Sequence, residues 1–492
     1  MAKPVRGQVA QMTFWESDRL IVAMKPGNAG GAKGPTGMRR DLRDRTAGLR
    51  TGAQFSTKLK SLTSRARRSP GNRFCSLMHL ITLDSLRACF GDLKRNKAPG
   101  IDEVTIAEYE ANLEENLRDL QARLKARTYR PQPAKRVYIP KPNGKQRPLG
   151  IPTVEDKVVQ MACKKILEAV FEVDFLSVSY GFRPGRRCHD ALDELSRMLL
   201  SRPIGYIADL DIECFFDTVS HEWLMCCLGQ RIKDTAFLRL IIRFLRAGVV
   251  SEGRHLASDA GTPQGSVLSP VLANIYLHYI LDLWFERVIR PRLDGYAQLI
   301  RYADDFVVGF QYEREAQAFS AALRVRLAKF GLRLAEAKSR VIEFGRWRWQ
   351  YAVRLGRRLA TFDFLGFTHY CGPSRRGQFK VGRKTAQARL RRSLKAMNEW
   401  LKGIRNQTKR TDWWPVLALR LRGYYNYYAI GGNMKWVSIY DYRVRGLVFK
   451  WLNERSQERS YTWEQFKRLE RYNPLPRPRL CRGYPVLVRM QT

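Results

Sequence analysis

The sequence predicts an α+β fold, with short strands in the middle of the chain and helices in its C-terminal part. Short apolar runs typical of strands occur at 136–152, 206–217 and 299–311. From about residue 383 to about residue 470, apolar side chains recur at helical spacing instead. A length of 492 residues, of which 45% are hydrophobic, allows roughly two to four domains with cores of their own.

Helices alternate with extended segments in the first 311 residues. The predicted helices lie near 77–86 and over 103–126, 154–172 and 189–201. A Pro-Gly turn at 96–102 separates the first two. The extended runs of 136–152 flank the turn Pro142–Gly144, and 206–217 predicts a strand that enters a loop. Two apolar runs joined by Ala-Asp-Asp predict a hairpin at 299–311.

The charge of the chain favours a polyanionic partner. It carries 88 Lys and Arg against 46 Asp and Glu, a formal net charge of +42. A chain this basic repels itself when it is compact, so we expect it to bind nucleic acid. An anionic membrane is the alternative, but no basic amphipathic helix stands alone as an anchor and no run of about 18 apolar residues occurs. We therefore expect no membrane partner.

The cysteines and the N-terminus favour the cytoplasm. The nine Cys are irregularly spaced and form no CxxC pair, which is typical of a reducing compartment. The first twenty residues contain no apolar segment of the kind that secretory signals have. We expect a cytosolic protein.

Residues 1–72 differ from the rest of the chain. They hold 15 Lys and Arg against 4 Asp and Glu, and 25–37 is glycine-rich. This composition predicts a flexible basic extension. The extension either has no role of its own or is an arm that touches nucleic acid.

Two predicted strands carry acidic residues where apolar ones would be expected. Asp211 follows an apolar run, and the pair Asp304–Asp305 lies at the tip of the predicted hairpin. Buried carboxylates need a compensating cation, and oxygen ligands suit Mg²⁺. Two such ions about 3.5–4 Å apart stabilise the attacking and leaving oxygens of a phosphoryl transfer. Ordinary turn chemistry is the alternative reading of an Asp pair at a hairpin tip.

Six motifs, in this order, resemble those of bacterial group II intron-encoded reverse transcriptases. They are KPNGKQRPLGIPTVEDKVVQ (141–160), SYGFRPGRRCHDAL (179–192), DIECFFD (211–217), GTPQGSVLSPVLANIYL (261–277), YADD (302–305) and FDFLGF (362–367). The resemblance covers roughly residues 75–480. It implies a right-hand polymerase, with fingers and a ferredoxin-like antiparallel palm, followed by a helical thumb and maturase domain.

The resemblance also implies a division of the chain. We expect a basic flexible N-terminal extension, an N-terminal extension to the fingers together with the fingers, a palm, a helical thumb with maturase domain X, and a Pro-rich basic tail. Their expected ranges are 1–72, 73–195, 196–372, 373–472 and 473–492.

By the same resemblance, Asp211, Asp304 and Asp305 are the catalytic residues and hold two Mg²⁺ ions. The carbonyl of Ile212 adds a further ligand. Phe216 lies five residues after Asp211, where the family has a bulky gate that excludes a 2′-hydroxyl. Plain core packing is the alternative role for this ring.

Further residues are implied in nucleotide binding. The cations Lys141, Lys145 and Arg147 are expected to meet the triphosphate, because Arg in particular suits bidentate phosphate contacts. Arg147 is the first choice because the resembled family repeats Arg-Pro-Leu-Gly at this place. A solvated basic turn is the alternative for the three residues. Gln264 and Gly265 resemble the residues that pack against the nucleotide and template. Lys338 resembles a basic residue of the next palm motif that assists the pyrophosphate, but it could equally be a surface lysine.

Contacts to the template and primer are implied at three further places. The turn at 96–102 places Lys97 and Gly100 near the template RNA. Phe364, Leu365 and Gly366 lie in the segment that resembles the primer grip. Arg389, Arg391 and Arg392 are expected to face a nucleic acid duplex, because 374–395 holds nine Lys and Arg and no acidic residue.

The aromatic and basic segment 421–452 resembles the maturase domain, which implies binding to the chain's own intron RNA. Core packing is the alternative for most of its aromatic rings. The last histidine is His369 and only Cys481 follows position 371, so an HNH endonuclease is not expected. For His189 and His221 we expect structural roles.

The function implied is RNA-directed DNA synthesis together with intron splicing and mobility. The expected partners are group II intron RNA, an RNA template, a DNA or RNA primer, dNTPs and a target DNA. Two alternatives stay open: a maturase with a vestigial polymerase, and a group II-derived reverse transcriptase that works without an intron in repair or phage defence. An RNA replicase is disfavoured by Phe216.

Overall fold

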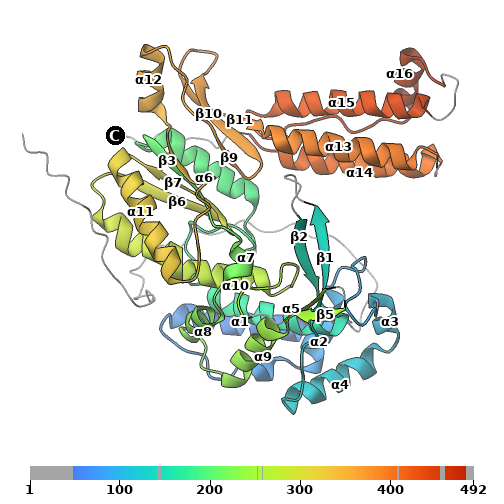
Figure 1. Cartoon of the computed structure of the whole chain (residues 1–492). Coiled ribbons are helices and arrows are strands. Elements are labelled where there is room, and N and C mark those ends of the chain that lie inside the picture. The colour runs from blue at the N-terminus through green and yellow to red at the C-terminus, as the bar shows by residue number, and fades with distance from the viewer. Residues whose placement is uncertain are drawn as a thin grey trace, which may run out of the picture.

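The structure is a computed structural model that describes residues 48–140, 146–251, 253–256, 259–406, 409–454 and 460–483, with side chains from residue 54 onward. Within these ranges, helices at both ends of the chain flank three sheets, which confirms the α+β class (Figure 1). The predicted turn Pro142–Gly144, together with Lys141 and Lys145, lies outside the described residues. No helix in the described ranges is long and apolar enough to cross a membrane.

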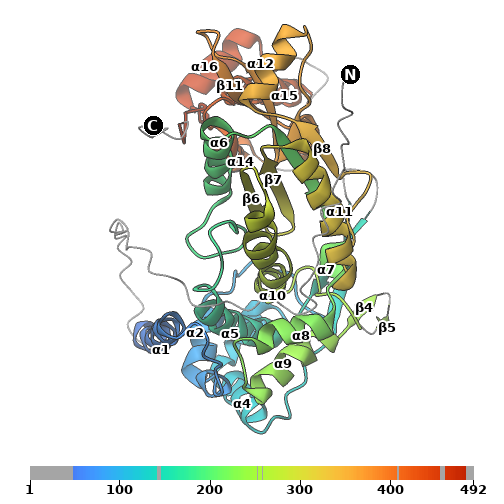
Figure 2. The ribbon, with the colours of Figure 1, turned by 90° about the vertical axis from the view of Figure 1, so that its left-hand side faces the viewer.

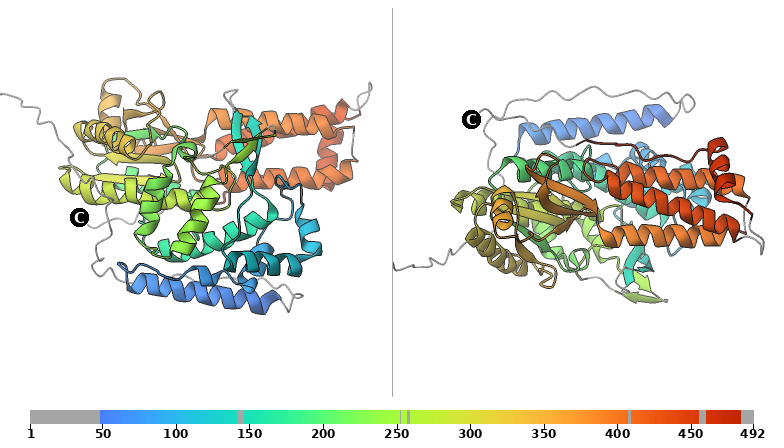
Figure 3. Two further views of the ribbon diagram at one scale, coloured as in Figure 1. Left: turned by 60° about the horizontal axis from the view of Figure 1, so that its bottom comes forward. Right: turned by 90° about the horizontal axis from the view of Figure 1, so that it is seen from above.

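The first described helix corrects the expectation of a flexible extension over residues 1–72. Helix α1 (Gly48–Arg68) packs on α2 (Leu83–Gly91) and α5 (Val154–Phe171) and lies along one side of the molecule (Figure 3). Phe55, Leu62 and Ala66 are buried in the contact. Their spacing forms an apolar stripe that the many surrounding basic residues obscure in the sequence. Residues 1–47 lie outside the described part of the chain.

The helix predicted over 103–126 is two helices, α3 (Ile106–Ala111) and α4 (Leu113–Lys125). Asn112, with φ −117° and ψ 36°, breaks the ladder between them. Thr105 caps α3 through a capping box with Glu108. A short 3₁₀ turn, η1 (Met78–Leu80), precedes α2.

A small sheet stands out between the N-terminal and the C-terminal helices (Figure 1). Strands β1 (Ala134–Pro140) and β2 (Gln146–Ile151) form the predicted hairpin, which β4 (Val249–Ser251) and β5 (Arg254–Leu256) extend in the order β2-β1-β4-β5. Arg147 lies on β2 of this hairpin.

The central sheet is antiparallel and has the order β6-β7-β3-β8. Its strands are β3 (Tyr206–Asp211), β6 (Ala297–Tyr302), β7 (Asp305–Phe310) and β8 (Arg340–Glu343). Helices α6 (Cys188–Ser201) and α11 (Glu313–Lys329) flank it (Figure 2). Because side chains alternate along a strand, Ile207 and Val307 pack with α6 while Ala208 and Val308 pack with α11.

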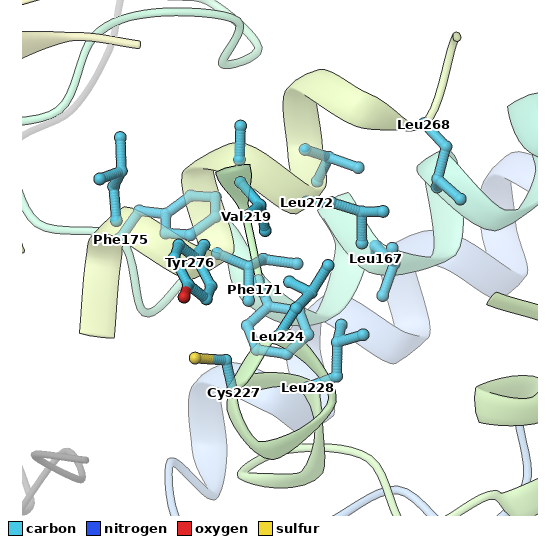
Figure 4. Packing of buried hydrophobic residues seen from close by; sticks show 14 of the residues in the cluster. Leu167, Phe171, Phe175, Val219, Leu224, Cys227, Leu228, Leu268, Leu272 and Tyr276 are labelled. Atoms are coloured by element: carbon cyan, nitrogen blue, oxygen red, sulfur yellow. The ribbon is translucent and has the colours of Figure 1, made fainter. Parts of the chain in front are cut away.

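The largest core lies below the central sheet. There α5, α8 (His221–Gly229) and α10 (Ser269–Leu277) meet through side chains such as Phe171, Leu224 and Leu272 (Figure 4). The other elements around this core are α7 (Phe215–Thr218), α9 (Thr235–Arg246) and the turns η2 (His278–Asp282), η3 (Phe285–Ile289) and η4 (Arg290–Arg292). The core gives the sheet a rigid base.

The C-terminal part begins with a sheet and continues as helices, as predicted. Strands β9 (Phe362–Phe364), β10 (Phe367–Pro373) and β11 (Phe379–Thr385) follow the exposed helix α12 (Arg346–Arg354). Helices α13 (Gln387–Ile404), α14 (Arg410–Tyr428) and α15 (Met434–Asn453) then lie side by side, with α16 (Trp463–Tyr472) at their far end (Figure 1). Most of their aromatic rings are core residues: the ring of Tyr424 stacks on that of Tyr440 at 3.5 Å between centroids, and Trp451 is buried.

Phe55→Ala should loosen α1, because removing a buried phenyl ring costs about 3–5 kcal/mol. Hydrogen exchange measured by mass spectrometry should show faster exchange of the α1 amides. Lys58→Ala, on the exposed face of the same helix, is the control and should change the free energy of unfolding by less than about 0.5 kcal/mol. Unchanged protection of α1 in Phe55→Ala would show that the helix does not depend on this contact.

Candidate active site

A cavity of about 1160 Å³ opens beside the end of β3. Its lining includes eight residues that the sequence suggested from separate motifs: Arg147, Asp211, Ile212, Phe216, Gln264, Gly265, Asp304 and Lys338. Segments more than 190 positions apart in the chain therefore meet at one place. This is the cavity that we take as the active-site candidate.

Strand pairing brings the carboxylates together. Asp211, the last residue of β3, is the register partner of Asp305, the first residue of β7. Asp305 is also paired with Tyr302 on β6, so Ala303 and Asp304 form a two-residue turn. Ala303 has a φ of 58°, the positive value that tight two-residue hairpin turns require at their first central residue. The antiparallel register thus places three acidic residues at one end of the sheet, where β3 ends and β7 begins.

Burial makes the paired carboxylates costly to ionise. Burial raises the pKa of Asp304, and the nearby Asp211 raises it further, while Arg147 and Arg301 lower it in part. Burial raises the pKa of Asp305 to about 7, with the charge of Asp304 adding to the effect. Carboxylates in this situation favour a cation beside them.

Lys338 supplies one such positive charge. Its Nζ lies 2.5 Å from Oδ2 of Asp211, and this hydrogen bond raises the pKa of the lysine. The loop that carries it is fixed along the end of β3, because the N–H of Ala335 donates to the carbonyl of Asp211 at 2.8 Å. Lys338 is therefore part of the cavity and not an isolated surface lysine.

The oxygen donors fit Mg²⁺ in kind. Asp211, Ile212 and Asp304 line the cavity, and Asp305 lies next to them as the register partner of Asp211, outside the described lining. The carboxylate of Asp305 accepts a hydrogen bond from the backbone N–H of Leu365. In the described ranges no three His, Cys, Asp or Glu side chains are arranged to hold a metal ion by themselves. Mg²⁺ commonly takes one or two carboxylates and completes its shell with water and substrate phosphates, which suits two carboxylates and a carbonyl.

Strand β2, which carries Arg147, meets the loop that carries Gln264 at the cavity. The N–H of Gly150 on β2 donates to the carbonyl of Gln264 at 2.6 Å. Gly265 has a φ of 110°, and a Cβ there would lie 2.7 Å from the carbonyl oxygen of Gly150. Glycine is therefore required for this close approach of backbone to backbone. The exposed Arg147 and the Gln264 side chain consequently share one wall.

Phe215 and Phe216 both line the cavity, but they differ in exposure. Phe215 is 2% exposed, whereas Phe216 is half-buried and packs against the main core with part of its surface. The two rings meet edge to face at 5.3 Å between centroids. The carbonyl of Phe216 accepts a 2.6 Å hydrogen bond from the N–H of Thr262, which fixes the backbone under the ring. Core packing alone does not account for Phe216.

The residues expected to grip the primer divide into buried and accessible ones. Phe364 is 1% exposed and belongs to the core beside β10, so its ring cannot contact a primer. Leu365 and Gly366 are half-buried and have φ values of 50° and 81°. The hydroxyl of Tyr427 on α14 donates to the carbonyl of Leu365 at 2.8 Å. The turn, not Phe364, is the part that could meet nucleic acid.

The expected template contacts near 96–102 also change. Lys97 is exposed, but Gly100 is buried. A Cβ on Gly100 would lie 2.6 Å from the Cα of Thr153, so the glycine serves the packing of the chain on itself. Direct contact of Gly100 with RNA is therefore not supported.

The three arginines of α13 are exposed, as a duplex-facing role requires. Arg389 and Arg392 both lower the pKa of Tyr428, which burial raises. A Cβ on Gly366 would lie 3.2 Å from the hydroxyl of the same tyrosine. Arg389 and Arg392 therefore lie near the turn at Leu365 and Gly366.

Both histidines have structural partners, as expected. Nε2 of His189 lies 2.9 Å from the carbonyl oxygen of Tyr427, and Nε2 of His221 lies 2.7 Å from that of Gly261.

Sequence reasoning missed other cavity residues, among them Phe182, Asp217, Arg324 and Arg333. Phe182 and Asp217 belong to the motifs at 179–192 and 211–217. For Phe182, an apolar ring beside the glycines of its turn could have indicated a role at the cavity.

Comparisons with known proteins agree with the site. The family described as "Reverse transcriptase (RNA-dependent DNA polymerase)" matches residues 139–369. Protein YkfC of Escherichia coli is 37% identical over 287 residues, which is 52% of this chain and 75% of that protein. Group II intron-encoded protein LtrA of Lactococcus lactis is 39% identical over 201 residues, 41% of this chain and 33% of LtrA.

A plant protein shares a shorter region. Nuclear intron maturase 4, mitochondrial, of Arabidopsis thaliana is 32% identical over 134 residues, 26% of this chain and 16% of that protein. The chain thus spans three quarters of the Escherichia coli relative and a third or less of the other two. With the motifs gathered at one cavity, these similarities show that the chain belongs to the reverse transcriptase family.

Proposed function

We propose that this RNA-directed DNA polymerase extends a DNA or RNA primer on an RNA template, from dNTPs, in the cavity beside β3. The observation that carries the proposal is the meeting of Asp211 and Asp304 with Arg147, Phe216 and Gln264 in that one cavity. Nucleotide transfer needs acidic residues that bind a metal ion and a cation that binds phosphate. An aromatic ring beside them can contact the sugar.

Asp211 and Asp304 would hold two Mg²⁺ ions, with the carbonyl of Ile212 as a further ligand. Bound there, Mg²⁺ supplies charge stabilisation to the attacking and leaving oxygens of nucleotidyl transfer. Arg147 provides the bidentate cation for the triphosphate. Lys338 neutralises Asp211 in the free protein, and once released it is near enough to the cavity to meet the pyrophosphate.

Phe216 selects the sugar of the incoming nucleotide. Its ring lines the cavity beside the carboxylates, and its backbone is fixed by Thr262. A fixed ring leaves no room for a 2′-hydroxyl, which favours dNTPs over ribonucleotides.

We further propose that the chain binds group II intron RNA and promotes its splicing and mobility. The exposed arginines of α13 and the net positive charge of +42 support RNA binding. The names of LtrA, a group II intron-encoded protein, and of the Arabidopsis intron maturase point to introns. The protein would stabilise the folded RNA by binding it, while the RNA performs the splicing chemistry. An intron-independent reverse transcriptase is the second candidate, and genomic flanks without intron RNA would favour it.

Asp304→Asn should lower cDNA synthesis on an RNA template with Mg²⁺ by at least about a hundredfold, because it removes a charged metal ligand. RNA affinity should stay unchanged. Primer-extension assays measure the cDNA synthesis, and filter binding measures the RNA affinity. Asp294→Asn, a 65% exposed carboxylate on the protein surface, is the control and should keep full activity. Retained synthesis in Asp304→Asn would refute the metal assignment.

Phe216→Ala should raise ribonucleotide incorporation relative to dNTP incorporation by about tenfold, because it opens the space beside the sugar. Single-nucleotide extension with matched dNTP and rNTP gives the ratio. Phe182→Ala removes another exposed ring from the same cavity and should leave the ratio unchanged. An unaltered ratio in Phe216→Ala would return this ring to a packing role.

Replacing Arg389, Arg391 and Arg392 by Gln should flatten the dependence of RNA affinity on salt. The slope of log affinity against log salt should fall by roughly one unit for each lost phosphate contact. Equilibrium binding to intron RNA at several salt concentrations measures it.

The matched control is the replacement by Gln of Arg197, Arg290 and Arg314, which also removes three positive charges. These arginines are half-exposed or more and already paired with carboxylates. Equal slopes for the two triple variants would place the α13 face away from RNA.

A further inference from the structure

The guanidinium of Arg301 is buried directly beneath the catalytic turn. The side chains of Arg301 and Asp282 are both 0% exposed. Nε of Arg301 donates to Oδ1 of Asp282 at 2.7 Å, and Nη2 donates to Oδ2 at 2.5 Å. Asp282 ends the π-helical turn η2 that continues α10. A fully buried ion pair needs every remaining donor and acceptor to be satisfied.

The remaining donors of Arg301 bind three other segments. Nη1 donates to the carbonyl of Ala303 at 3.0 Å and to Oδ1 of Asn274 at 3.1 Å. Nη2 donates to the hydroxyl of Ser179 at 2.9 Å. The rigid fork of a guanidinium can serve these five acceptor atoms of four residues, whereas a lysine ammonium has three donors and a single centre.

The contact with Ala303 concerns the peptide that joins it to Asp304. Ala303 holds a φ of 58°, which costs energy for a residue with a Cβ. Its carbonyl is the group that Arg301 binds, so the guanidinium fixes the orientation of the peptide plane just before the carboxylate. A strained backbone conformation persists only when its surroundings hold it. The contact with Arg301 is one such restraint on Ala303.

A second contact presses on the same turn. A Cβ on Gly181 would lie 2.3 Å from the backbone nitrogen of Ala303, so the segment after Ser179 packs directly against it. Nδ2 of Asn274 donates to the carbonyl of Gly181 at 2.7 Å, while its Oδ1 binds Arg301. Asn274 therefore ties the packing segment and the guanidinium together.

We propose that Arg301 is a positioning residue for nucleotidyl transfer: its buried guanidinium, held by Asp282, fixes the Ala303 carbonyl and so holds Asp304 at the cavity. The inference deepens the proposed polymerase function and rests on the proposed role of Asp304 there. It is independent of intron binding. Arg301 itself touches neither substrate nor metal.

Arg301→Lys is the direct test. A lysine keeps the positive charge beside Asp282, but its ammonium group cannot bind all five acceptor atoms that Arg301 binds. We expect kcat for single-nucleotide incorporation to fall about ten- to a hundredfold, as displacement of a reacting group by about 1 Å does. KM for dNTP and the affinity for template-primer should change less than about threefold, since Arg301 is buried and touches neither the dNTP nor the template-primer. Rates are normalised to the fraction of protein that binds template-primer.

Arg231→Lys is the matched control for lost stability. Arg231 forms another buried ion pair, with Asp174, whose side chains are 4% and 6% exposed, and it also donates to the carbonyl of Ala66. This pair lies away from the described lining of the cavity. We expect Arg231→Lys to lower the melting temperature as much as Arg301→Lys does, yet to keep kcat within about threefold of the parent.

A second substitution separates positioning from general damage. Glycine adopts positive φ without cost, so Ala303→Gly should restore part of the kcat lost in Arg301→Lys while leaving the melting temperature of that variant unimproved. Should Arg301→Lys not fold, Asn274→Ala, which removes one link to the guanidinium, should show the same fall in kcat with unchanged KM.

Equal kcat in Arg301→Lys and Arg231→Lys would overturn the inference, and so would a full kcat in Asn274→Ala. Failure of the proposed function has a different signature. In that case Asp304→Asn itself would retain activity, whereas an inactive Asp304→Asn beside a fully active Arg301→Lys rejects the positioning role alone.

Discussion

The placement of acidic side chains at the ends of two paired antiparallel strands is the constraint on which the rest of the structure depends. Register pairs Asp211 with Asp305, and it is fixed because each face of the sheet has its own apolar partner. A slip of one residue would turn Ile207 and Val307 away from α6 and move the carboxylates to the opposite face. Packing of the two faces therefore determines where the chemistry can take place.

The turn between β6 and β7 connects distant parts of the chain. Gly181 packs against it, Arg301 holds it from below, and the N–H of Leu365 reaches the carboxylate of Asp305. Leu365 is in turn bound by Tyr427 of α14, whose own carbonyl meets His189 on α6. A continuous set of contacts thus links the C-terminal helices, which carry the basic face, to the carboxylates at the cavity.

Local patterns predicted most of the fold, and family motifs predicted eight of the residues that line the cavity. Short apolar runs revealed β3, β6 and β7, and the motifs identified residues such as Asp211, Phe216 and Gln264. The errors came from long-range packing. Helix α1 depends on its packing on α2 and α5, and the ring of Phe364 is buried in the core beside β10. Nothing in the sequence indicated a role for Arg301, because a basic residue before a hairpin turn is usually a surface charge. Its role depends on acceptors in Asp282, Asn274, Ser179 and Ala303, which only the fold brings together.

The central claim is that Asp211 and Asp304 hold a divalent cation where Lys338 now neutralises Asp211. The most direct test is a crystal structure of the protein with template-primer, Mn²⁺ and a non-hydrolysable dNTP, with the metal located by anomalous scattering. The account predicts metal bound to oxygens of both Asp211 and Asp304, with the Lys338 ammonium withdrawn from Asp211. Metal bound elsewhere, or a Lys338–Asp211 contact that persists in the occupied site, would contradict it.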